Sequence, residues 1–126
     1  MQKEYKFKAL GKHVEGPNKN LETFPAPQGV TSIVFTTDEF TSYCPVTRQP
    51  DFSKVTIEYI PDQLCLESKS LKLYLWSFRE ETAFCESLAA QIAQDVKKAC
   101  QPKYCKVTVE QNARGGIALT AIAEEQ

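Results

Sequence analysis

The stretch Glu81–Cys100, ETAFCESLAAQIAQDVKKAC, carries the clearest secondary-structure signal in the chain. Its apolar side chains recur every four residues, which places them on one face of an amphipathic helix. They are Phe84, Leu88, Ile92, Val96 and the pair Ala99 and Cys100. Thr82 is the expected N-cap, because its side chain accepts from free backbone N–H groups, and Pro102 ends the helix.

The segments on both sides of this helix predict strands and one further helix. Glu67–Phe78 consists mostly of good helix formers. Apolar alternation or β-branched composition predicts strands at Val30–Thr36, Lys54–Ile60, Lys106–Gln111 and Ile117–Ala123, a short extended piece at Leu64–Leu66 and a turn at Asn112–Gly116. The expected order is strand, strand, helix, helix, strand, strand. It corresponds to an α+β layer with an antiparallel sheet, helices on one face and two open edges that favour oligomerisation.

The length of 126 residues suits one domain. Residues 1–29 are polar and rich in turn formers, so we expect an N-terminal arm followed by a single domain over residues 30–126. The 15 Lys and Arg residues nearly balance 16 Asp and Glu residues, which argues against non-specific binding to nucleic acid or membrane. With no long apolar run, we expect neither a transmembrane helix nor a signal peptide.

The chain contains five cysteines, at positions 44, 65, 85, 100 and 105. An odd number of cysteines without a secretion signal favours reduced thiols and a cytoplasmic location. Cys100 and Cys105 could form half of a metal site, but the only histidine, His13, is distant in sequence. We therefore expect no structural metal.

The segment Tyr43–Phe52, YCPVTRQPDF, places a thiol seven residues before a carboxyl group. Pro45 and Pro50 fix φ and remove backbone donors, so we expect an irregular loop and neither a helix nor a central strand. A rigid loop with these groups suggests a nucleophile, Cys44, beside a proton donor, Asp51. The same residues would also suit a Pro-braced loop with a buried structural thiol.

Three other positions have the chemistry to bind a ligand. Glu67–Lys72, ESKSLK, combines hydroxyls and lysines near a helix start, which suits a phosphate but also an ordinary solvated helix end. Arg114 precedes two glycines and could grip a phosphate or simply occupy a hairpin turn. Glu86, in the first turn of the long helix, could accept paired N–H donors from a guanine-like ring or complement the helix dipole.

Taken together, these elements resemble the QueF family, the NADPH-dependent nitrile reductases that reduce cyano-deazaguanine in queuosine biosynthesis. The resemblance is to the short, single-module form, and it rests on Cys44–Asp51, ESKSLKLY, Phe84-x-Glu86, Arg114-Gly115-Gly116, Leu21–Phe24 and Gln49–Phe52. It implies the tunnelling fold, in which subunits join edge to edge into a barrel. It also implies a homo-oligomer, expected as a decamer of two pentameric rings, with active sites between subunits.

The resemblance further implies a role for each site residue. Cys44 would attack the nitrile carbon to form a covalent thioimide, and Asp51 would protonate the nitrogen. NADPH would then reduce the carbon twice, giving the aminomethyl product. The implied substrate-binding residues are Glu67, Phe84, Cys85 and Glu86. The implied cofactor-binding residues are Ser68, Lys69, Ser70, Lys72 and Arg114.

The chain departs from the family pattern in front of Glu86, where Cys85 stands in place of the usual histidine, and at Arg79–Thr82. A cysteine is only a weak hydrogen-bond donor and is not cationic. We therefore expect Asp51, water or both to serve the proton steps. Cys85 is also the expected partner of Cys44 in a protective disulfide.

Three other functions stay open. A QueF-like amidinotransferase uses the same Cys and Asp on a tRNA-borne nitrile without NADPH, but that branch lacks an ESKSLK-type segment. A tunnelling-fold enzyme acting on pterins would need a metal and histidine ligands. A non-catalytic purine-binding or thiol-sensing module would bind its ligand without using Cys44 as a nucleophile. The expected partner is a small deazapurine, with no membrane and no direct nucleic-acid partner.

Overall fold

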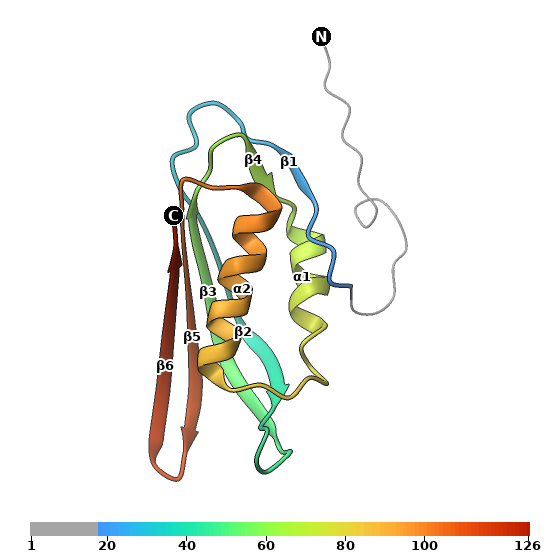
Figure 1. Ribbon diagram of the computed structural model, residues 1–126, viewed down its shortest axis with the longest axis vertical. Helices are drawn as coiled ribbons and strands as arrows, with labels where there is room; N and C mark the ends of the chain where they lie inside the picture. The colour runs from blue at the N-terminus through green and yellow to red at the C-terminus, as the bar shows by residue number, and fades with distance from the viewer. Residues whose placement is uncertain (1–17) are drawn as a thin grey trace.

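A computed structural model describes residues 18–126 (Figure 1). In chain order the elements are β1 (Thr23–Pro25), β2 (Ile33–Tyr43), β3 (Pro50–Ile60), β4 (Leu64–Leu66), α1 (Ser68–Trp76), α2 (Cys85–Cys100), β5 (Tyr104–Arg114) and β6 (Ile117–Glu125). His13 and most of the predicted N-terminal arm lie outside the described residues. The predicted order of strands and helices is confirmed, and β1 with β4 adds a short pair that the arm was not expected to form.

One antiparallel sheet carries the fold, with the spatial order β2-β3-β5-β6. Both helices cover the same face of this sheet, as Figure 1 shows, with α2 packed on β5 and β6 and α1 beside β2. β2 and β6 are the edge strands of this sheet, so each has one side without a strand partner among the described residues. None of the helices in the described part of the chain is long and apolar enough to cross a membrane.

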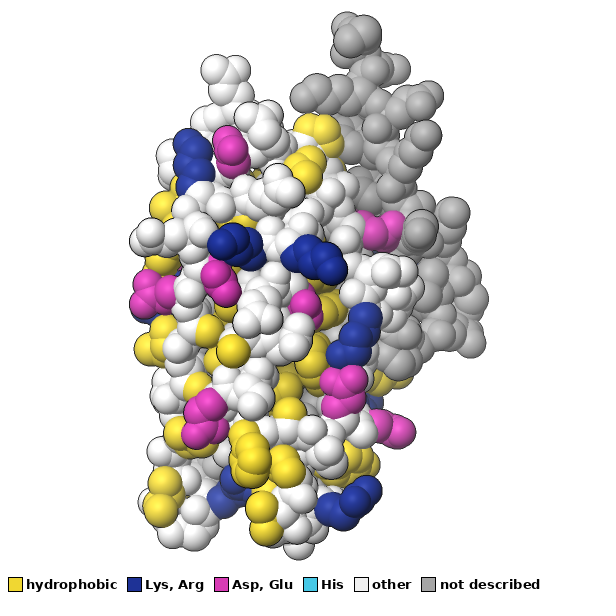
Figure 2. Space-filling model, viewed as in Figure 1, with side chains coloured by type: hydrophobic (Ala, Val, Ile, Leu, Met, Phe, Trp, Pro, Cys, Tyr) yellow, Lys and Arg dark blue, Asp and Glu magenta, His cyan; other side chains and the backbone are white. Residues whose placement is uncertain are grey.

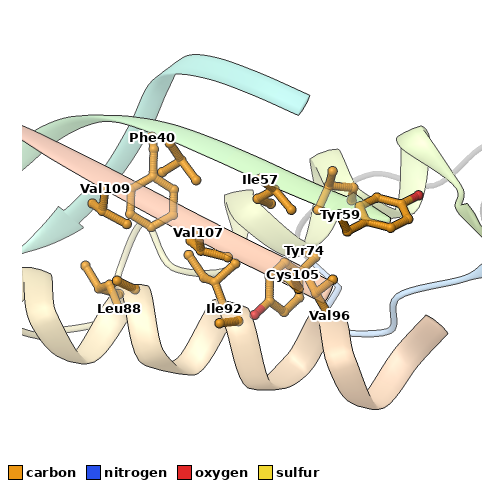
Figure 3. Close-up of a cluster of buried hydrophobic side chains, with 14 of the residues drawn as sticks. Phe40, Ile57, Tyr59, Tyr74, Leu88, Ile92, Val96, Cys105, Val107 and Val109 are labelled. Atoms are coloured by element: carbon orange, nitrogen blue, oxygen red, sulfur yellow. The ribbon is translucent and has the colours of Figure 1, made fainter. Parts of the chain in front are cut away.

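The core lies between α2 and the two middle strands (Figure 3). Alternate residues of β3 and β5 point toward the helices because successive side chains of a strand face opposite sides. The fully buried members include Val55, Ile57, Tyr59, Val107, Val109, Leu88, Ile92 and Val96. Burial of these largely apolar side chains holds the sheet and α2 in one unit and fixes the register that positions the strand ends.

The start of α2 differs from the prediction at two residues. Phe84 was expected in the apolar stripe, but it is the N-cap and its side chain is 56% exposed. Thr82 was expected as the N-cap, but it forms an isolated bridge with Tyr43 and the helix begins only at Cys85. The physical reason is a tertiary anchor: the Tyr43 N–H donates to the Glu81 carbonyl at 2.8 Å, which draws the connecting segment onto the end of β2.

The segment around Cys44 is more regular than predicted. β2 runs to Tyr43 and β3 begins at Pro50, so the irregular part is a hairpin loop over residues 44–49. The expectation that the whole segment lies outside a central strand is wrong, because β3 is an inner strand of the sheet. Pro50 is tolerated because it is the first residue of the strand, where a missing N–H disturbs the ladder least.

The hairpin between β5 and β6 is also tighter than predicted. β5 continues to Arg114 through an irregular register after Gln111, so the expected turn at residues 112–116 is reduced to Gly115 and Gly116. Both glycines have positive φ, 59° and 82°, in the region that glycine adopts at least cost. This extension places Arg114 at the end of a strand.

Candidate active site

Two hairpins and the start of α2 meet at one end of the fold (Figure 1). Asp51 from β3 and Arg114 from β5 join across this end in an ion pair, with 2.6 Å between Nη1 and Oδ1. The same guanidinium donates through Nη2 to the Gln111 amide oxygen at 3.0 Å. Cys44 lies in the neighbouring hairpin loop, so the structure brings together the predicted nucleophile and proton donor, with Arg114 beside both.

The loop of Cys44 is closed by its own backbone. The Cys44 N–H donates to the Gln49 carbonyl at 2.9 Å, and the Arg48 N–H donates to the Cys44 carbonyl at 2.9 Å. Arg48 adopts a positive φ of 59°, which lets the chain return within this short loop. The closure turns the backbone N–H groups of Val46 and Thr47 toward the thiol.

These donors make Cys44 acidic. The pKa of Cys44 is lowered to about 7, first by the N–H and hydroxyl of Thr47, then by the Val46 N–H and the Arg114 guanidinium. A hydrogen bond or positive charge that favours the thiolate lowers a thiol pKa in this way. Cys44 therefore exists in part as the nucleophilic thiolate at neutral pH.

Alkylation of Cys44 by iodoacetamide should rise with pH and reach half its maximal rate near the pKa of about 7. The reason is that the thiolate is the reacting species, whereas an unperturbed thiol would give a midpoint near ~8.5. Site-resolved mass spectrometry over a pH series measures the midpoint. Cys65 serves as the internal control, because burial raises the pKa of its thiol. A Cys44 midpoint at the free-thiol value would contradict the role of the loop.

Asp51 lies in a buried polar cluster that we define as Ser42, Asp51, Ser53 and Gln111. All four face the helices at the same end of the sheet, where Ser42 is paired with Asp51 and Ser53 with Gln111. The Asp51 side chain is only 2% exposed. The hydroxyls of Ser42 and Ser53 have no hydrogen-bond partner among the described residues. Asp51 is thus held in a setting with little access to bulk water, which strengthens its electrostatic interactions.

The sequence also predicted three positions at the start of α2, and the structure separates them. Phe84 and Glu86 are exposed and remain available to a ligand. Cys85 is buried, and its thiol donates to the Val109 carbonyl at 3.5 Å. Burial, followed by the charge of Glu86, raises the pKa of Cys85, which makes it a poor nucleophile. All five cysteines are free thiols, so nothing in the structure supports the predicted disulfide with Cys44.

The ESKSLK segment forms the start of α1, and two of its members stabilise that start. The Glu67 carboxylate accepts from the N–H groups of Lys69 and Ser70, both at 2.7 Å, and caps the helix. The Ser70 hydroxyl donates to the Glu67 carbonyl and accepts from the Glu22 N–H, each at 2.9 Å. Both side chains are buried. We infer that they fix the segment in place.

The upstream segment holds this helix start from outside. The Glu67 N–H donates to the Glu22 carbonyl at 2.8 Å, and the Asn18 N–H donates to the Leu73 carbonyl at 3.2 Å. β1 then pairs with β4 immediately before α1. Residues 18–25 therefore form a strap over the start of α1.

Replacing Glu67 by alanine should lower the free energy of unfolding by about 1–2 kcal/mol, because it removes an N-cap acceptor and leaves buried N–H groups unpaired. Chemical denaturation followed by circular dichroism measures this change. Glu80→Ala, at an exposed glutamate outside both helices, is the matched control and should have little effect. Equal stability of the two variants would contradict the capping role.

The remaining cofactor candidates lie in the first turns of α1, and the groove that Ser68 and Lys72 line does not include Cys44. Ser68 and Lys72 line a groove of about 410 Å³ between β2 and α1, together with the aromatic side chains of Phe35 and Trp76. α1 begins near β4 and runs toward the end that holds the β2–β3 hairpin loop, so its first turn is the part farther from that loop (Figure 1). Arg114, also predicted to bind the cofactor, instead contacts Asp51 and lies beside Cys44.

The surface at the Cys44 end includes a group of exposed apolar side chains. Figure 2 shows hydrophobic side chains gathered toward this end of the helix-covered face, with Lys or Arg side chains beside them. Exposed members near the hairpin loops and the start of α2 are Val46, Phe52, Phe84 and Ile117. An apolar rim beside a thiolate and a buried carboxyl group suits a flat heteroaromatic ligand.

Sequence reasoning missed Gln111, Ser42 and Ser53. The signal for Gln111 was present in β5, because it continues the alternation of Val107 and Val109 that face the core. A polar residue at a buried position of such a pattern usually has a specific partner. For Gln111 that partner is Arg114.

The chain matches known proteins over most of its length. A family model described as QueF-like protein matches residues 50–126. The NADPH-dependent 7-cyano-7-deazaguanine reductase of Alkalilimnicola ehrlichii is 47% identical over 112 residues, covering 87% of this chain and 87% of the relative. The enzyme of the same name from Syntrophus aciditrophicus is 49% identical over 117 residues, covering 91% and 83%.

A solved structure supports the fold as well. The crystal structure of the archaeosine synthase QueF-Like in the apo form aligns with a TM-score of 0.73 and 30% identity, covering 77% of this chain and 95% of that chain. The likeness confirms the predicted tunnelling fold, with its antiparallel sheet and two helices on one face. From the family model, the similar reductases and this shared fold, we conclude that the chain belongs to the QueF family.

Proposed function

We propose that this protein is an NADPH-dependent 7-cyano-7-deazaguanine reductase, which converts the nitrile to an aminomethyl group in queuosine biosynthesis. The observation that carries the proposal is the placement of an acidic thiol, Cys44, in a loop beside the buried Asp51 and its partner Arg114. The names of relatives 47–49% identical to this chain support it. A thiolate and a carboxyl group together supply a nucleophile and a proton donor.

The two catalytic side chains divide a difficult reduction into easier steps. The Cys44 thiolate attacks the nitrile carbon, a C–S bond forms, and one electron pair of the C≡N bond moves to nitrogen. Asp51 takes up the proton that the Cys44 thiol releases on ionising and passes it to this nitrogen, giving a thioimide. The Arg114 guanidinium stabilises Asp51 as a carboxylate before and after this relay. A thioimide is a better hydride acceptor than a nitrile. Between the two hydride transfers the C–S bond breaks, which releases Cys44 as a thiolate and leaves an imine. When bound, two NADPH molecules in turn would supply the hydrides that complete the reduction to the amine.

The residues at the start of α2 suit the purine-like ring. The Glu86 carboxylate is exposed and can accept two N–H groups from the pyrimidine edge of a deazaguanine, and the exposed Phe84 ring offers an apolar face. Cys85 contributes packing beneath them. Because it cannot replace a histidine in proton transfer, we assign the proton steps to Asp51 and water.

The groove between β2 and α1 suits NADPH. Lys72 provides a cation, Ser68 provides a hydroxyl, and Trp76 provides an aromatic surface on one wall. Lys69 adds a second cation at the same helix start. This donor set fits the phosphates and an aromatic ring of a dinucleotide.

The distribution of these groups supports an oligomer. Ser68 and Lys72 line a groove that does not include Cys44, and β2 and β6 leave two sheet edges open. We propose that edge pairing closes a ring in which the groove of one subunit serves the Cys44 of another, as two stacked five-membered rings. We further propose a cytoplasmic location, which the five free thiols support, and no direct nucleic-acid partner.

The test is to mix protein, 7-cyano-7-deazaguanine and NADPH and to follow cofactor absorbance together with product mass. We expect substrate-dependent oxidation of two NADPH per aminomethyl product. Protein alkylated at Cys44 is the control and should oxidise none. The solved relative is an archaeosine synthase, so a tRNA bearing the nitrile and an amine donor form the second arm. If the protein consumes that nitrile without oxidising NADPH, its activity is amidine formation and the proposed reduction is wrong.

A further inference from the structure

We propose that Gln111 is a positioning residue that holds the Arg114 guanidinium between Asp51 and Cys44. The inference rests on the proposed function, because it concerns the same catalytic pair. It assigns Gln111 a role in preparing the nucleophile and the proton donor, and it gives Arg114 a role in the protein without cofactor. The predicted contact of Arg114 with NADPH does not account for either role.

The argument begins with the geometry of the guanidinium. Nη2 donates to the Gln111 Oε1 at 3.0 Å, while Nη1 donates to the Asp51 Oδ1 at 2.6 Å. Because a guanidinium is planar and its N–H directions are fixed relative to one another, two such bonds define its orientation. Anchoring Nη2 therefore determines where Nη1 points.

The Gln111 side chain is held more rigidly by its surroundings than the Arg114 side chain. The Arg114 side chain is 50% exposed and stands next to the glycine turn, so its own surroundings restrict it little. Gln111 is only 6% exposed and is paired with Ser53 between the two inner strands of the sheet. A long side chain loses rotamer freedom when it is fixed, and a preformed buried acceptor favours the fixed state. Gln111, which is fixed by the sheet, therefore restrains the Arg114 side chain.

The amide is suited to this place because it accepts without charge. A carboxylate at position 111 would compete with Asp51 for the guanidinium and would add a second buried anion near the Cys44 thiolate. The titratable groups that face Arg114 are Cys44 from the loop, Asp51 from β3 and Cys85 from α2. An apolar residue at position 111 would leave Nη2 without its buried acceptor.

The consequence for Cys44 is measurable. Arg114 is one of the groups that lower the pKa of Cys44, after the donors of Thr47 and Val46. If Gln111 is lost, the guanidinium can leave this position, and the part of the thiolate stabilisation that it supplies is lost. The loop donors remain, so the effect on the thiol is partial.

The experiment measures iodoacetamide alkylation of Cys44 against pH in Gln111→Met, which has a similar volume but no strong acceptor. We expect the midpoint to move upward, with an alkylation rate at neutral pH lower by about two- to fivefold. In the reductase assay kcat should fall more than the KM for NADPH rises. Gln111→Asn has a side chain one methylene shorter, so its amide oxygen lies farther from Arg114 while the residue stays polar. It should shift the midpoint of Cys44 alkylation in the same direction. Its circular dichroism spectrum establishes folding.

Two controls separate positioning from general damage. Ser53→Ala alters the cross-strand neighbour of Gln111, has no hydrogen bond to lose, and should leave the midpoint unchanged. In an Arg114→Ala background, Gln111→Met should give no further shift, because Gln111 acts through the guanidinium. An unchanged midpoint in both Gln111 variants, or an equal shift without Arg114, would overturn the proposal. The alkylation assay needs no substrate, so it is independent of whether the protein proves to be a reductase.

Discussion

Cys44→Ala is expected to reduce nitrile reduction by at least about four orders of magnitude, since covalent attack is the step that makes the nitrile carbon reducible. The variant should fold normally, because Cys44 lies in a hairpin loop and makes its closing bonds through the backbone. Incubation of the native protein with the cyano substrate should add the mass of the intact substrate to the peptide containing Cys44. The variant should show no such adduct.

Cys105→Ala is the matched control for this experiment. Cys105 is fully buried, and burial raises its pKa to about 11, so it cannot serve as the nucleophile. The control should keep its turnover and its adduct, with only a loss of stability from the small cavity. Nitrile reduction by Cys44→Ala at the native rate would show that the covalent mechanism is wrong.

Asp51→Asn should lower kcat by roughly two to four orders of magnitude, the usual contribution of a positioned general acid. Asparagine retains an oxygen that can accept from Arg114, but it has no acidic proton to deliver to the nitrile nitrogen. Because proton transfer accompanies attack by Cys44, the adduct should also form more slowly. Rapid-quench mass spectrometry measures adduct formation, and cofactor absorbance measures turnover.

Asp62→Asn, at an exposed aspartate in the turn after β3, provides the control and should retain turnover. Asp51→Glu keeps the carboxyl group but displaces it by one methylene, so we expect a loss of kcat between that of the native protein and that of Asp51→Asn. Native turnover in Asp51→Asn would transfer the proton-donor role to another group.

The sequence allowed the sheet and helices to be predicted because their signals are local. Alternation in β3 and the four-residue spacing of Leu88, Ile92 and Val96 both report which side chains face the core. The start of α2 was misplaced because it depends on the bond between Tyr43 and Glu81, which are distant in sequence. No local pattern encodes such an anchor.

The residues of the candidate site also fall into two groups, those that the local sequence predicts and those that depend on the tertiary structure. Cys44 and Asp51 could be proposed from one short loop, and the structure places them beside Arg114. The position of Arg114 was not predictable, because it depends on the extension of β5 beyond Gln111. The structural roles of Glu67 and Ser70 were also hidden, since composition does not distinguish a buried cap from an exposed phosphate ligand.

The strap over the start of α1 gives the protein a built-in reporter. The Glu22 amide hydrogen is bonded to the Ser70 hydroxyl, 48 residues away, and is protected from solvent only while the strap and helix start are joined. Its exchange with deuterium therefore follows the opening of this one contact, on a timescale of local unfolding. A single amide resonance can thus follow the integrity of the proposed cofactor groove without any ligand, substrate or turnover.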